Sequence, residues 1–407
     1  MADLPGFVAS GSSLAELLRS DGMIDVVGVA DTAARAMELL ARHRPAIITV
    51  DVELKHISAY ELTRRMMETY PIPVVIVSGH WSSDHVATTL AAMEAGAVAV
   101  ATKPGEPGLE IAAVETMRAQ SAEATRRLIQ TVKTMSEVRV VRRRRRGEGG
   151  LPPQADRGWE PQTVPPPVSS TMSFRPREIG VVAIGASTGG PLALQTILSR
   201  IPRDFPAPLL IVQHIAPGFL PGLAEWLTTT TGFPVHVAAR GDMLLPGQAC
   251  LAPDGSHMGI GADGRIALRP PVVNGTPLAS SPRLETANNG PCPSISHLFA
   301  SVGQAFGARA IGVLLSGMGG DGAEELKLMR ERGALTVVQD RESCVVYGMP
   351  ARAIAIGAAS SALAPDAIGI LLADVVARNP KLETRNEVWS AAIARFRVST
   401  DQRWNGE

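Results

Sequence analysis

The sequence predicts an α/β protein built from two parallel-sheet domains that are joined by a proline- and arginine-rich linker. Short runs of β-branched residues alternate with helical stretches over residues 7–125, and the same alternation resumes at residue 179. Between the two series, residues 147–178 contain prolines at 152, 153, 161, 165, 166, 167 and 176. A segment so rich in proline cannot continue a helix or form a central strand, so the two series are expected to fold separately.

Composition and charge are consistent with two or three globular domains. The chain has 407 residues, of which 45% are hydrophobic and 19% charged, and this is enough apolar material for more than one core. Lysines and arginines together number 39, as do aspartates and glutamates, so the formal net charge is zero. Without a strong overall field, neither nucleic acid nor an acidic membrane surface is a predicted partner.

The cysteines and the N-terminus indicate a protein of a reducing cytoplasm. The three cysteines, Cys250, Cys292 and Cys344, are widely spaced and form no C-x-x-C pair, which argues against a disulfide framework or a thiolate zinc site. The first residues lack the basic flank and apolar core of a secretion signal, and no apolar stretch approaches the ~18 residues that a membrane span needs. We therefore expect a cytoplasmic protein without membrane insertion.

The first domain is expected over residues 1–125. Continuous apolar runs at 26–29, 46–50 and 73–77 are typical of buried parallel strands. Helical spacing occupies 32–44, 59–70 and 83–95, and Ser83 or Asp84 is predicted as the N-cap of the last of these helices. A longer helix is expected at 110–140, so that residues 126–178 comprise its end and the linker.

The run of arginines at 142–146 is interpreted as a solvated patch at the domain boundary. Binding of a receptor tail, nucleic acid or anionic lipid is the alternative for this patch, and we assign it no site.

The second domain is expected over residues 179–375. Apolar runs at 179–184, 209–212, 310–315 and 334–338 predict strands of a second parallel sheet, with helices between them. The remaining tail, 376–407, is polar apart from Trp389, Ile393 and Phe396 at helical spacing, and we assign it no function.

Three polar residues follow strands of this second sheet, at the edge where functional side chains of parallel sheets gather. Ser187 lies in the glycine-rich turn at 185–191, His214 follows the next strand, and Asp321 lies in the glycine-rich turn at 316–322. The turn around Ser187 has the spacing of a nucleophile elbow. A histidine can take the proton of a serine near neutral pH, and an aspartate can orient the imidazole and stabilise its cation. The three together predict nucleophilic catalysis.

Each residue also has an alternative interpretation when it is taken alone. The turn at 185–191 could be a dinucleotide phosphate loop, but it lacks the G-x-G-x-x-G spacing. His214 alone would suit a structural histidine, and Asp321 alone would suit the N-cap of a helix that starts near Ala323. The order Ser, His, Asp differs from that of α/β-hydrolases, so another hydrolase architecture is needed.

The same motifs resemble those of the chemotaxis protein-glutamate methylesterases of the CheB family. The resemblance rests on the turns at 185–191 and 316–322 and on Val-Gln-His at 212–214. It extends through Ala252-Pro253 with His257, Pro293-Ser-Ile295 with Leu298-Phe299, and Gln339-Asp340 with residues 343–350, and so covers most of residues 179–372. It implies a Rossmann-like methylesterase domain behind an N-terminal receiver domain of flavodoxin-like fold.

The resemblance implies a role for each site residue. Ser187 would be the nucleophile, His214 the base and Asp321 its orienting acid, with Thr188 and Met318 lining the site and their backbone amides facing the oxyanion. The implied reaction is hydrolysis of glutamyl γ-methyl esters on chemoreceptors, with related deamidation of glutamine, and it needs no cofactor. One departure is Ser296, where the family usually has an aspartate; because serine can also cap a helix, we interpret this change as structurally neutral.

The receiver resemblance matches the family at three positions and departs from it at the metal site. Asp51 matches the phospho-acceptor, Ser78 the switch hydroxyl and Lys103 the phosphate-pairing lysine, each at a strand end. Receivers place two adjacent acids after the first strand, but here residues 7–13 read Phe-Val-Ala-Ser-Gly-Ser-Ser, and the first helix is expected to be short. Without those acids, Mg²⁺ binding and phosphorylation of Asp51 are expected to be severely weakened.

The implied partners are methyl-accepting chemoreceptors and a chemotaxis histidine kinase. In the family, the receiver packs against the catalytic face and its phosphorylation relieves the block. Two other functions stay open for this sequence. The chain could be a receptor- or kinase-binding adaptor with a silent triad, or a serine hydrolase that acts on another, smaller ester.

Overall fold

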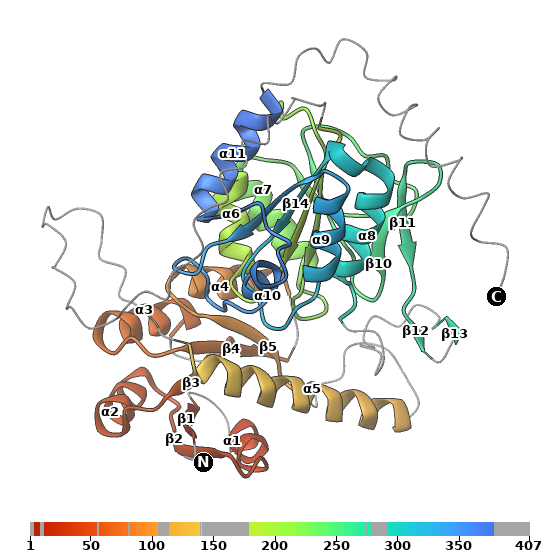
Figure 1. Cartoon of the computed structure of the whole chain (residues 1–407). Helices are drawn as coiled ribbons and strands as arrows, with labels where there is room; N and C mark the ends of the chain where they lie inside the picture. The colour runs from red at the N-terminus through yellow and green to blue at the C-terminus, as the bar shows by residue number, and fades with distance from the viewer. Residues whose placement is uncertain are drawn as a thin grey trace, which may run out of the picture.

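Two all-parallel sheets organise the chain, as the computed structural model in Figure 1 shows. The structure describes residues 4–8, 12–54, 57–79, 82–104, 114–138, 140, 179–273, 276–277 and 291–377. The linker at 147–178, the arginines at 142–146 and the tail from residue 378 therefore lie outside the described residues. None of the helices described is long and apolar enough to cross a membrane.

The first sheet has five strands in the order β2-β1-β3-β4-β5. This 2-1-3-4-5 order is the flavodoxin-like arrangement that receivers share, and the ligand edge lies at the carboxyl ends of β1 and β3, where the order reverses. The strands are β1 (Leu4–Val8), β2 (Ile24–Val29), β3 (Ile47–Asp51), β4 (Val74–Ser78) and β5 (Ala99–Thr102), and the helices are α1 (Ser12–Arg19), α2 (Ala33–His43), α3 (Ala59–Thr69), α4 (Ser83–Glu94) and α5 (Val114–Ser136).

The helices of this domain begin largely where the sequence predicts. Thr32 and Ser58 are the N-caps of α2 and α3, and each accepts a hydrogen bond from the backbone N–H three residues later. The N-cap of α4 is Ser82, which accepts from His85 N at 3.3 Å, so the prediction of Ser83 or Asp84 was wrong. Three capping residue types stand in a row here, and only the extended backbone of Ser82 distinguishes it from the others. As expected, α1 is short, with 8 residues.

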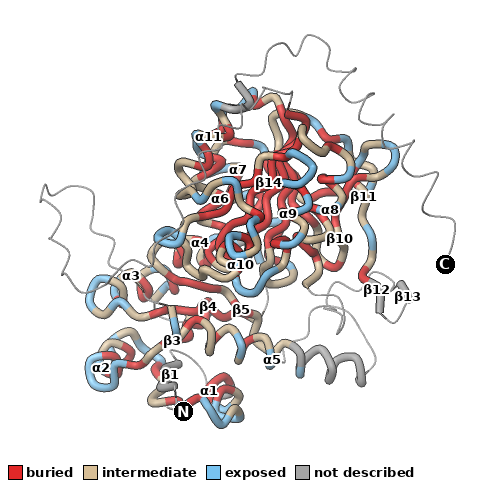
Figure 2. Tube along the Cα trace, viewed as in Figure 1, coloured by how far each residue is buried: buried red, intermediate tan, exposed pale blue. Residues whose placement is uncertain are grey.

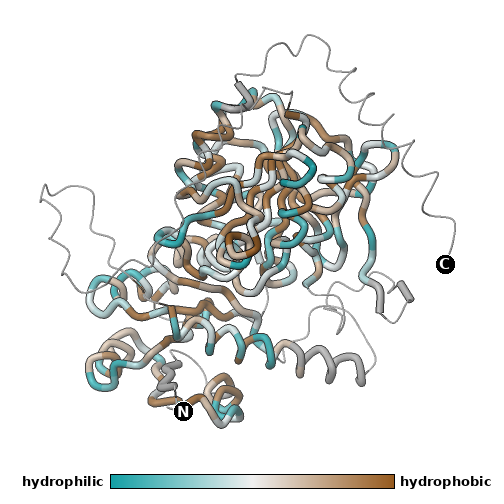
Figure 3. The backbone as a smooth tube through the Cα atoms, viewed as in Figure 1, coloured by the Kyte–Doolittle hydropathy of each residue, from teal (hydrophilic) through white to brown (hydrophobic). Residues whose placement is uncertain are grey.

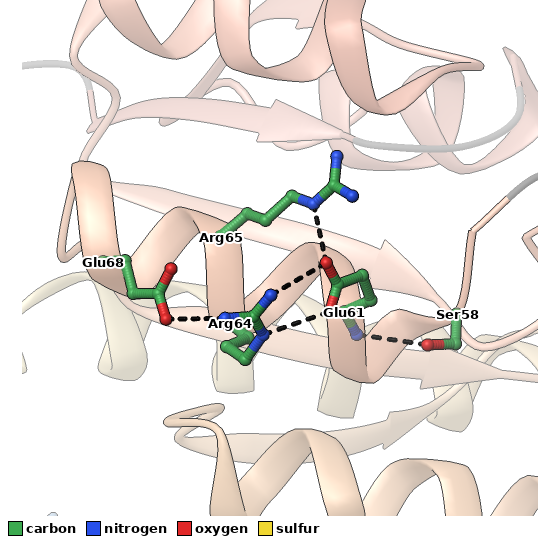
Figure 4. A network of polar contacts seen from close by, with 5 residues as sticks. All are labelled: Ser58, Glu61, Arg64, Arg65 and Glu68. Atoms are coloured by element: carbon green, nitrogen blue, oxygen red, sulfur yellow. Dashed lines mark hydrogen bonds and ion pairs between the residues drawn. The ribbon is translucent and has the colours of Figure 1, made fainter.

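Helix α3 carries an exposed network of ion pairs, which Figure 4 shows in detail. Glu61 contacts both Arg64 and Arg65, and Arg64 also reaches Glu68 at 2.8 Å. Hydrogen bonds from the two guanidinium groups lower the pKa of Glu61 to about 2. Because these groups are exposed to water, the network orders the helix surface and adds little to stability.

The second sheet has seven strands in the order β16-β15-β14-β6-β7-β9-β8, all parallel. The strands are β6 (Val181–Ala186), β7 (Leu209–Gln213), β8 (Val235–Val237), β9 (Ala249–Leu251), β14 (Ala310–Leu314), β15 (Leu335–Gln339) and β16 (Ser361–Leu363). The helices are α6 (Gly190–Leu198), α7 (Leu220–Thr231), α8 (Ile295–Phe306), α9 (Ala323–Glu331), α10 (Met349–Ala355) and α11 (Pro365–Ala377), with a 3-10 turn at Gly307–Arg309. Two hairpins, β10 (His257–Ile260) with β11 (Ile266–Arg269) and β12 (Val272–Val273) with β13 (Thr276–Pro277), extend from one side.

The central strands of the second sheet are buried on both faces, which explains their continuous apolar sequences. All residues of β6, β7 and β14 are buried, and Figures 2 and 3 show this core as a red and largely brown centre. Side chains that alternate along each strand pack into separate hydrophobic cores on the two faces of the sheet. The site described below lies at the carboxyl ends of these strands.

The two domains touch through α4 and α5. Gln195 on α6 donates to Glu94 at the end of α4 at 3.2 Å, and Val86 of α4 lies so close to Gly222 of α7 that a side chain there would collide with it. Helix α5 runs continuously across the predicted boundary at residue 125 and packs on the first sheet through Leu128 and its neighbours. Its later turns also approach the glycine-rich turn at 316–322.

Candidate active site

Ser187 follows β6 directly, on a tight turn into α6. Its backbone N–H donates to the Ser316 carbonyl at 3.1 Å, and its own carbonyl accepts from Gly190 N at 2.8 Å. Gly189 has a φ of 81°, in the left-handed region that favours glycine. A Cβ on Gly317 would lie 2.6 Å from the Cβ of Ser187, so the second glycine-rich turn must also lack a side chain at that point. The predicted elbow geometry is therefore present, with Ser187 partly exposed.

His214 follows the neighbouring strand β7 and is tied to the same edge. Its backbone N–H donates to the Ala186 carbonyl at 2.9 Å. Its Nε2 atom lies 3.1 Å from Oδ2 of Asp321, an ion-pair distance, although the ring N–H is not aligned for a regular hydrogen bond. Both side chains are mostly buried, at 17% and 12% exposed, so water weakens their attraction only partly.

Asp321 is held by the N-terminus of α8. Its carboxylate accepts from the backbone N–H groups of Ile295 at 2.7 Å and Ser296 at 3.0 Å, and from the Ser294 hydroxyl at 3.2 Å. Burial alone would raise the pKa of Asp321, but the contact with His214 and the two backbone donors outweigh it and bring this pKa below its usual value. Asp321 is thus an ionised, fixed partner for the imidazole.

Neither Asp321 nor Ser296 is a helix N-cap, so the alternative of an N-cap for Asp321 taken alone was wrong. Asp321 does not cap α9, whose N-cap is Gly322 without a side-chain bond. Ser296 does not cap α8 either, because Ser294 is its N-cap. Instead, the Ser296 hydroxyl donates to Glu325 on α9 and accepts from Gly322 N at 2.9 Å. It therefore ties the Asp321 turn to both helices.

Thr188 and Met318, the two residues expected to line the site, flank it from opposite turns. Thr188 follows Ser187 at the start of the turn into α6, and Met318 follows Gly317, with 46% of its surface exposed. The Thr134 hydroxyl of α5 lies 3.1 Å from the Met318 sulfur. Helix α5 of the first domain therefore reaches the edge of the site.

The three receiver residues also meet at one strand edge. Lys103 Nζ lies 3.5 Å from Asp51 Oδ2, the other carboxylate oxygen of Asp51 accepts from Glu53 N at 2.9 Å, and Lys103 N donates to the buried Ser78 carbonyl. Residues 9–11, where receivers carry their acids, lie outside the described residues and include no acid. Within the described part of the chain, no cluster of three His, Cys, Asp or Glu side chains could hold a metal ion. This donor set does not fit a receiver magnesium site.

A pair of histidines beside Asp321 was missed by the sequence analysis as a feature of the site. The rings of His257 and His297 lie 5.4 Å apart between centroids. Burial lowers the pKa of His297 to about 4, with help from the nearby charges of His257 and Arg269. Burial also lowers the pKa of His257, against the attraction of Asp321. Nothing in the sequence spacing of 40 residues indicates this pairing, which depends on β10 packing against α8.

These histidines predict a loss of stability in mild acid. Since the ordinary pKa of histidine is ~6.5, the unfolded chain takes up a proton below that value, whereas folded His297 stays neutral until about pH 4. The unfolding free energy should therefore fall by about 2 kcal/mol between pH 7 and pH 5 because of this group. Urea unfolding at both pH values checks this. His297→Gln should reduce the pH dependence, and the exposed control His43→Gln should not; equal dependence in both variants would contradict the assignment.

The fold and the site together define a class of protein. It is a response regulator in which a receiver-type domain packs beside a parallel-sheet domain that carries a serine, histidine and aspartate site. The chain belongs to the CheB methylesterase family. The family model for the CheB methylesterase matches residues 182–372, and that for the response regulator receiver domain matches residues 9–115.

Relatives along most of the chain carry the same description. The chain is 44% identical over 354 residues to protein-glutamate methylesterase/protein-glutamine glutaminase 4 of Geobacter metallireducens, which covers 86% of this chain and 91% of that protein. It is also 44% identical over 363 residues to protein-glutamate methylesterase/protein-glutamine glutaminase 1 of Syntrophus aciditrophicus. That match covers 88% of this chain and 93% of the relative.

Solved structures similar to each domain come from Thermotoga maritima. The CheB methylesterase catalytic domain is 32% identical, with a TM-score of 0.43 over 49% of this chain and 100% of that one. The response regulator domain of CheB is 25% identical, with a TM-score of 0.27 over 34% of this chain and 99% of that one.

Proposed function

We propose that this chain hydrolyses glutamyl γ-methyl esters on chemoreceptors, releasing methanol, and deamidates receptor glutamines by the same route. The observation that carries the proposal is the contact between His214 and an ionised Asp321 that is seated on α8, next to Ser187 on its elbow. The names of the relatives, methylesterase and glutaminase, support the substrate class. A cytoplasmic location remains the expectation from the three cysteines.

In the proposed mechanism, Ser187 Oγ attacks the side-chain carbonyl of the ester or amide. The His214 ring nitrogen that does not face Asp321 takes the serine proton and returns it to the ester oxygen or amide nitrogen of the leaving group, which departs as methanol or ammonia. Water, activated by the same nitrogen, then releases the receptor carboxylate and restores Ser187. Asp321 keeps its negative charge throughout and stabilises the imidazolium. No cofactor is needed in this scheme.

Two backbone amides are proposed to bind the oxyanion. The amide of Thr188 lies at the start of the turn into α6, and that of Met318 lies in the opposite glycine-rich turn. Donors fixed in this way are each worth roughly 100- to 1000-fold in rate. The contact of α5 with Met318 would place the first domain at the entrance to this part of the site.

The test of this function compares substrates on the full chain. Methanol release is measured from a methylated receptor cytoplasmic domain and, in parallel, phenol release is measured from a small aryl ester. Fast release from the receptor supports the methylesterase. Turnover of the small ester alone would favour a different serine hydrolase, and no turnover of either would favour the adaptor that docks on receptors or on a histidine kinase.

We also propose that the receiver is a poor phosphate acceptor, because Asp51 faces Lys103 with no acidic pair after β1 to hold Mg²⁺. Incubation with acetyl phosphate and Mg²⁺ should give no Asp51-dependent incorporation, in contrast to a receiver with an intact acidic pair as positive control. Incorporation into the chain that is lost in Asp51→Asn would overturn the proposal.

A further inference from the structure

A buried glutamine bridges the backbones of the proposed nucleophile and base. Gln213 is the last residue of β7 and is 1% exposed. Its side-chain Nε2 donates to the Ser187 carbonyl at 2.8 Å and to the His214 carbonyl at 2.9 Å. One amide group therefore satisfies acceptors on both residues, although Gln213 and Ser187 are 26 positions apart in sequence.

This bridge lies just beyond the last backbone hydrogen bonds between β6 and β7. The ladder between β6 and β7 ends at the pair Ala186 and Gln213, and His214 N to Ala186 O is the last backbone bond across it. The carbonyls of Ser187 and His214 lie one residue further along each chain. The Gln213 amide takes the place of a further rung and continues the connection into the site.

Burying the side-chain amide of Gln213 carries an energetic penalty. The Gln213 Oε1 atom is buried without a hydrogen-bond partner among the described residues. An unpartnered buried acceptor is unfavourable, and methionine, a side chain of similar size, would avoid it. The two Nε2 bonds are therefore what distinguishes glutamine from an apolar residue at this position.

The first turn of α6 fixes the amide from the other side. A Cβ on Gly190 would collide with Oε1 of Gln213, so the absence of a side chain at Gly190 allows the helix to pack directly on the carboxamide. Gly190 N also donates to the Ser187 carbonyl, the acceptor that Gln213 shares. The elbow, the helix and the glutamine thus form one packed unit.

We propose that Gln213 is a positioning residue, which sets the separation between the Ser187 hydroxyl and the His214 ring by holding both backbones. The inference rests on the proposed function of these two residues. Gln213 itself exchanges no proton and touches no reacting atom. Errors of about 1 Å in such a separation cost roughly 100-fold in rate, which sets the expected effect of losing the bridge.

The test uses Gln213→Met in the full chain, with Thr336→Val as the matched control. Thr336 is also fully buried and donates to the Ala358 carbonyl at 2.7 Å. It lies near the amino end of β15, at the edge of the sheet opposite to the site. Gln213→Met should lower kcat for methyl ester hydrolysis roughly 100-fold, with KM changed less than about threefold. Labelling of Ser187 by a fluorophosphonate probe should slow in parallel. Thr336→Val should lower the melting temperature and leave both rates near wild type.

Further variants keep the proposal open to refutation if Gln213→Met is too unstable to assay. Gly190→Ala should displace the carboxamide and slow labelling in the same way. Gln213→Glu cannot donate when ionised, so its rate relative to wild type should rise as the pH falls and the carboxyl group regains a proton. Wild-type labelling rates per folded molecule in Gln213→Met, or in Gly190→Ala and Gln213→Glu, would overturn the proposal. Because the probe needs no receptor, labelling tests the bridge even where wild-type chain releases no methanol and the proposed function fails.

Discussion

Replacing Ser187 by alanine is expected to reduce methanol release from methylated receptor by roughly 10⁶-fold, by analogy with other serine triads. The substitution removes the nucleophile and leaves the backbone contacts of the elbow in place, because Ser187 uses its N–H and carbonyl to hold the turn. The fold should therefore survive, and the loss should appear in kcat. Methanol release and thermal unfolding, measured on the same sample, separate the two effects.

The matched control is Ser199→Ala at the end of the same helix that follows Ser187. Its hydroxyl donates to the Gln195 carbonyl on an exposed face, so its loss should leave turnover unchanged. If Ser187→Ala keeps turnover within tenfold of wild type while Ser199→Ala behaves normally, the nucleophile lies elsewhere and the proposed mechanism fails.

The fold follows from sequence to a large extent because parallel strands have continuous apolar runs. The strands β3, β4, β7, β14 and β15 all lie within one or two residues of their predicted limits. The order of polar residues after these strands likewise predicts which side chains share an edge, since carboxyl ends of parallel strands meet there. Ser187, His214 and Asp321 were found in this way.

What the sequence does not contain is the set of contacts between segments remote from each other. The seat of Asp321 on α8 depends on residues 25 to 27 positions away, and a serine next to a helix start gives no sign of which carboxylate it will meet. The same holds for Ser296, whose hydroxyl binds Glu325 on α9 and does not cap α8. A cap depends on the few residues beside it, whereas contacts between helices depend on the packed structure.

The position of α5 adds a physical constraint on how substrate reaches the site. Thr134 contacts Met318, and Val345 and Val346 of the catalytic domain pack against the cluster that contains Leu128. In the proposed reaction, a receptor segment would have to approach the same loops. With a receiver that lacks its acidic pair, opening of this contact would have to be driven by something other than ordinary phosphorylation, such as binding of the receptor itself.

Replacing Asp321 by asparagine is expected to reduce turnover roughly 10⁴-fold, the loss seen when a triad aspartate becomes a neutral amide. An asparagine oxygen can still accept from the α8 N-terminus, but the amide cannot stabilise an imidazolium and presents an N–H to His214 in place of an acceptor. Because the wild-type pKa of Asp321 lies below its usual value, the carboxylate is ionised throughout the assay range, and the loss should be similar from pH 6 to pH 9.

The same substitution at Asp366, which pairs with Arg200 on the exposed surface of α11, provides the control and should leave turnover unchanged. Acid stability gives an independent check on Asp321. A carboxylate with a lowered folded pKa stabilises the fold above its unfolded pKa and loses that contribution as the pH falls. Asp321→Asn should therefore be less stable than wild type at pH 7 and converge toward it in acid. A variant that turns over within tenfold of wild type, with an unchanged pH dependence of unfolding, would show that Asp321 neither orients His214 nor gains from the helix that holds it.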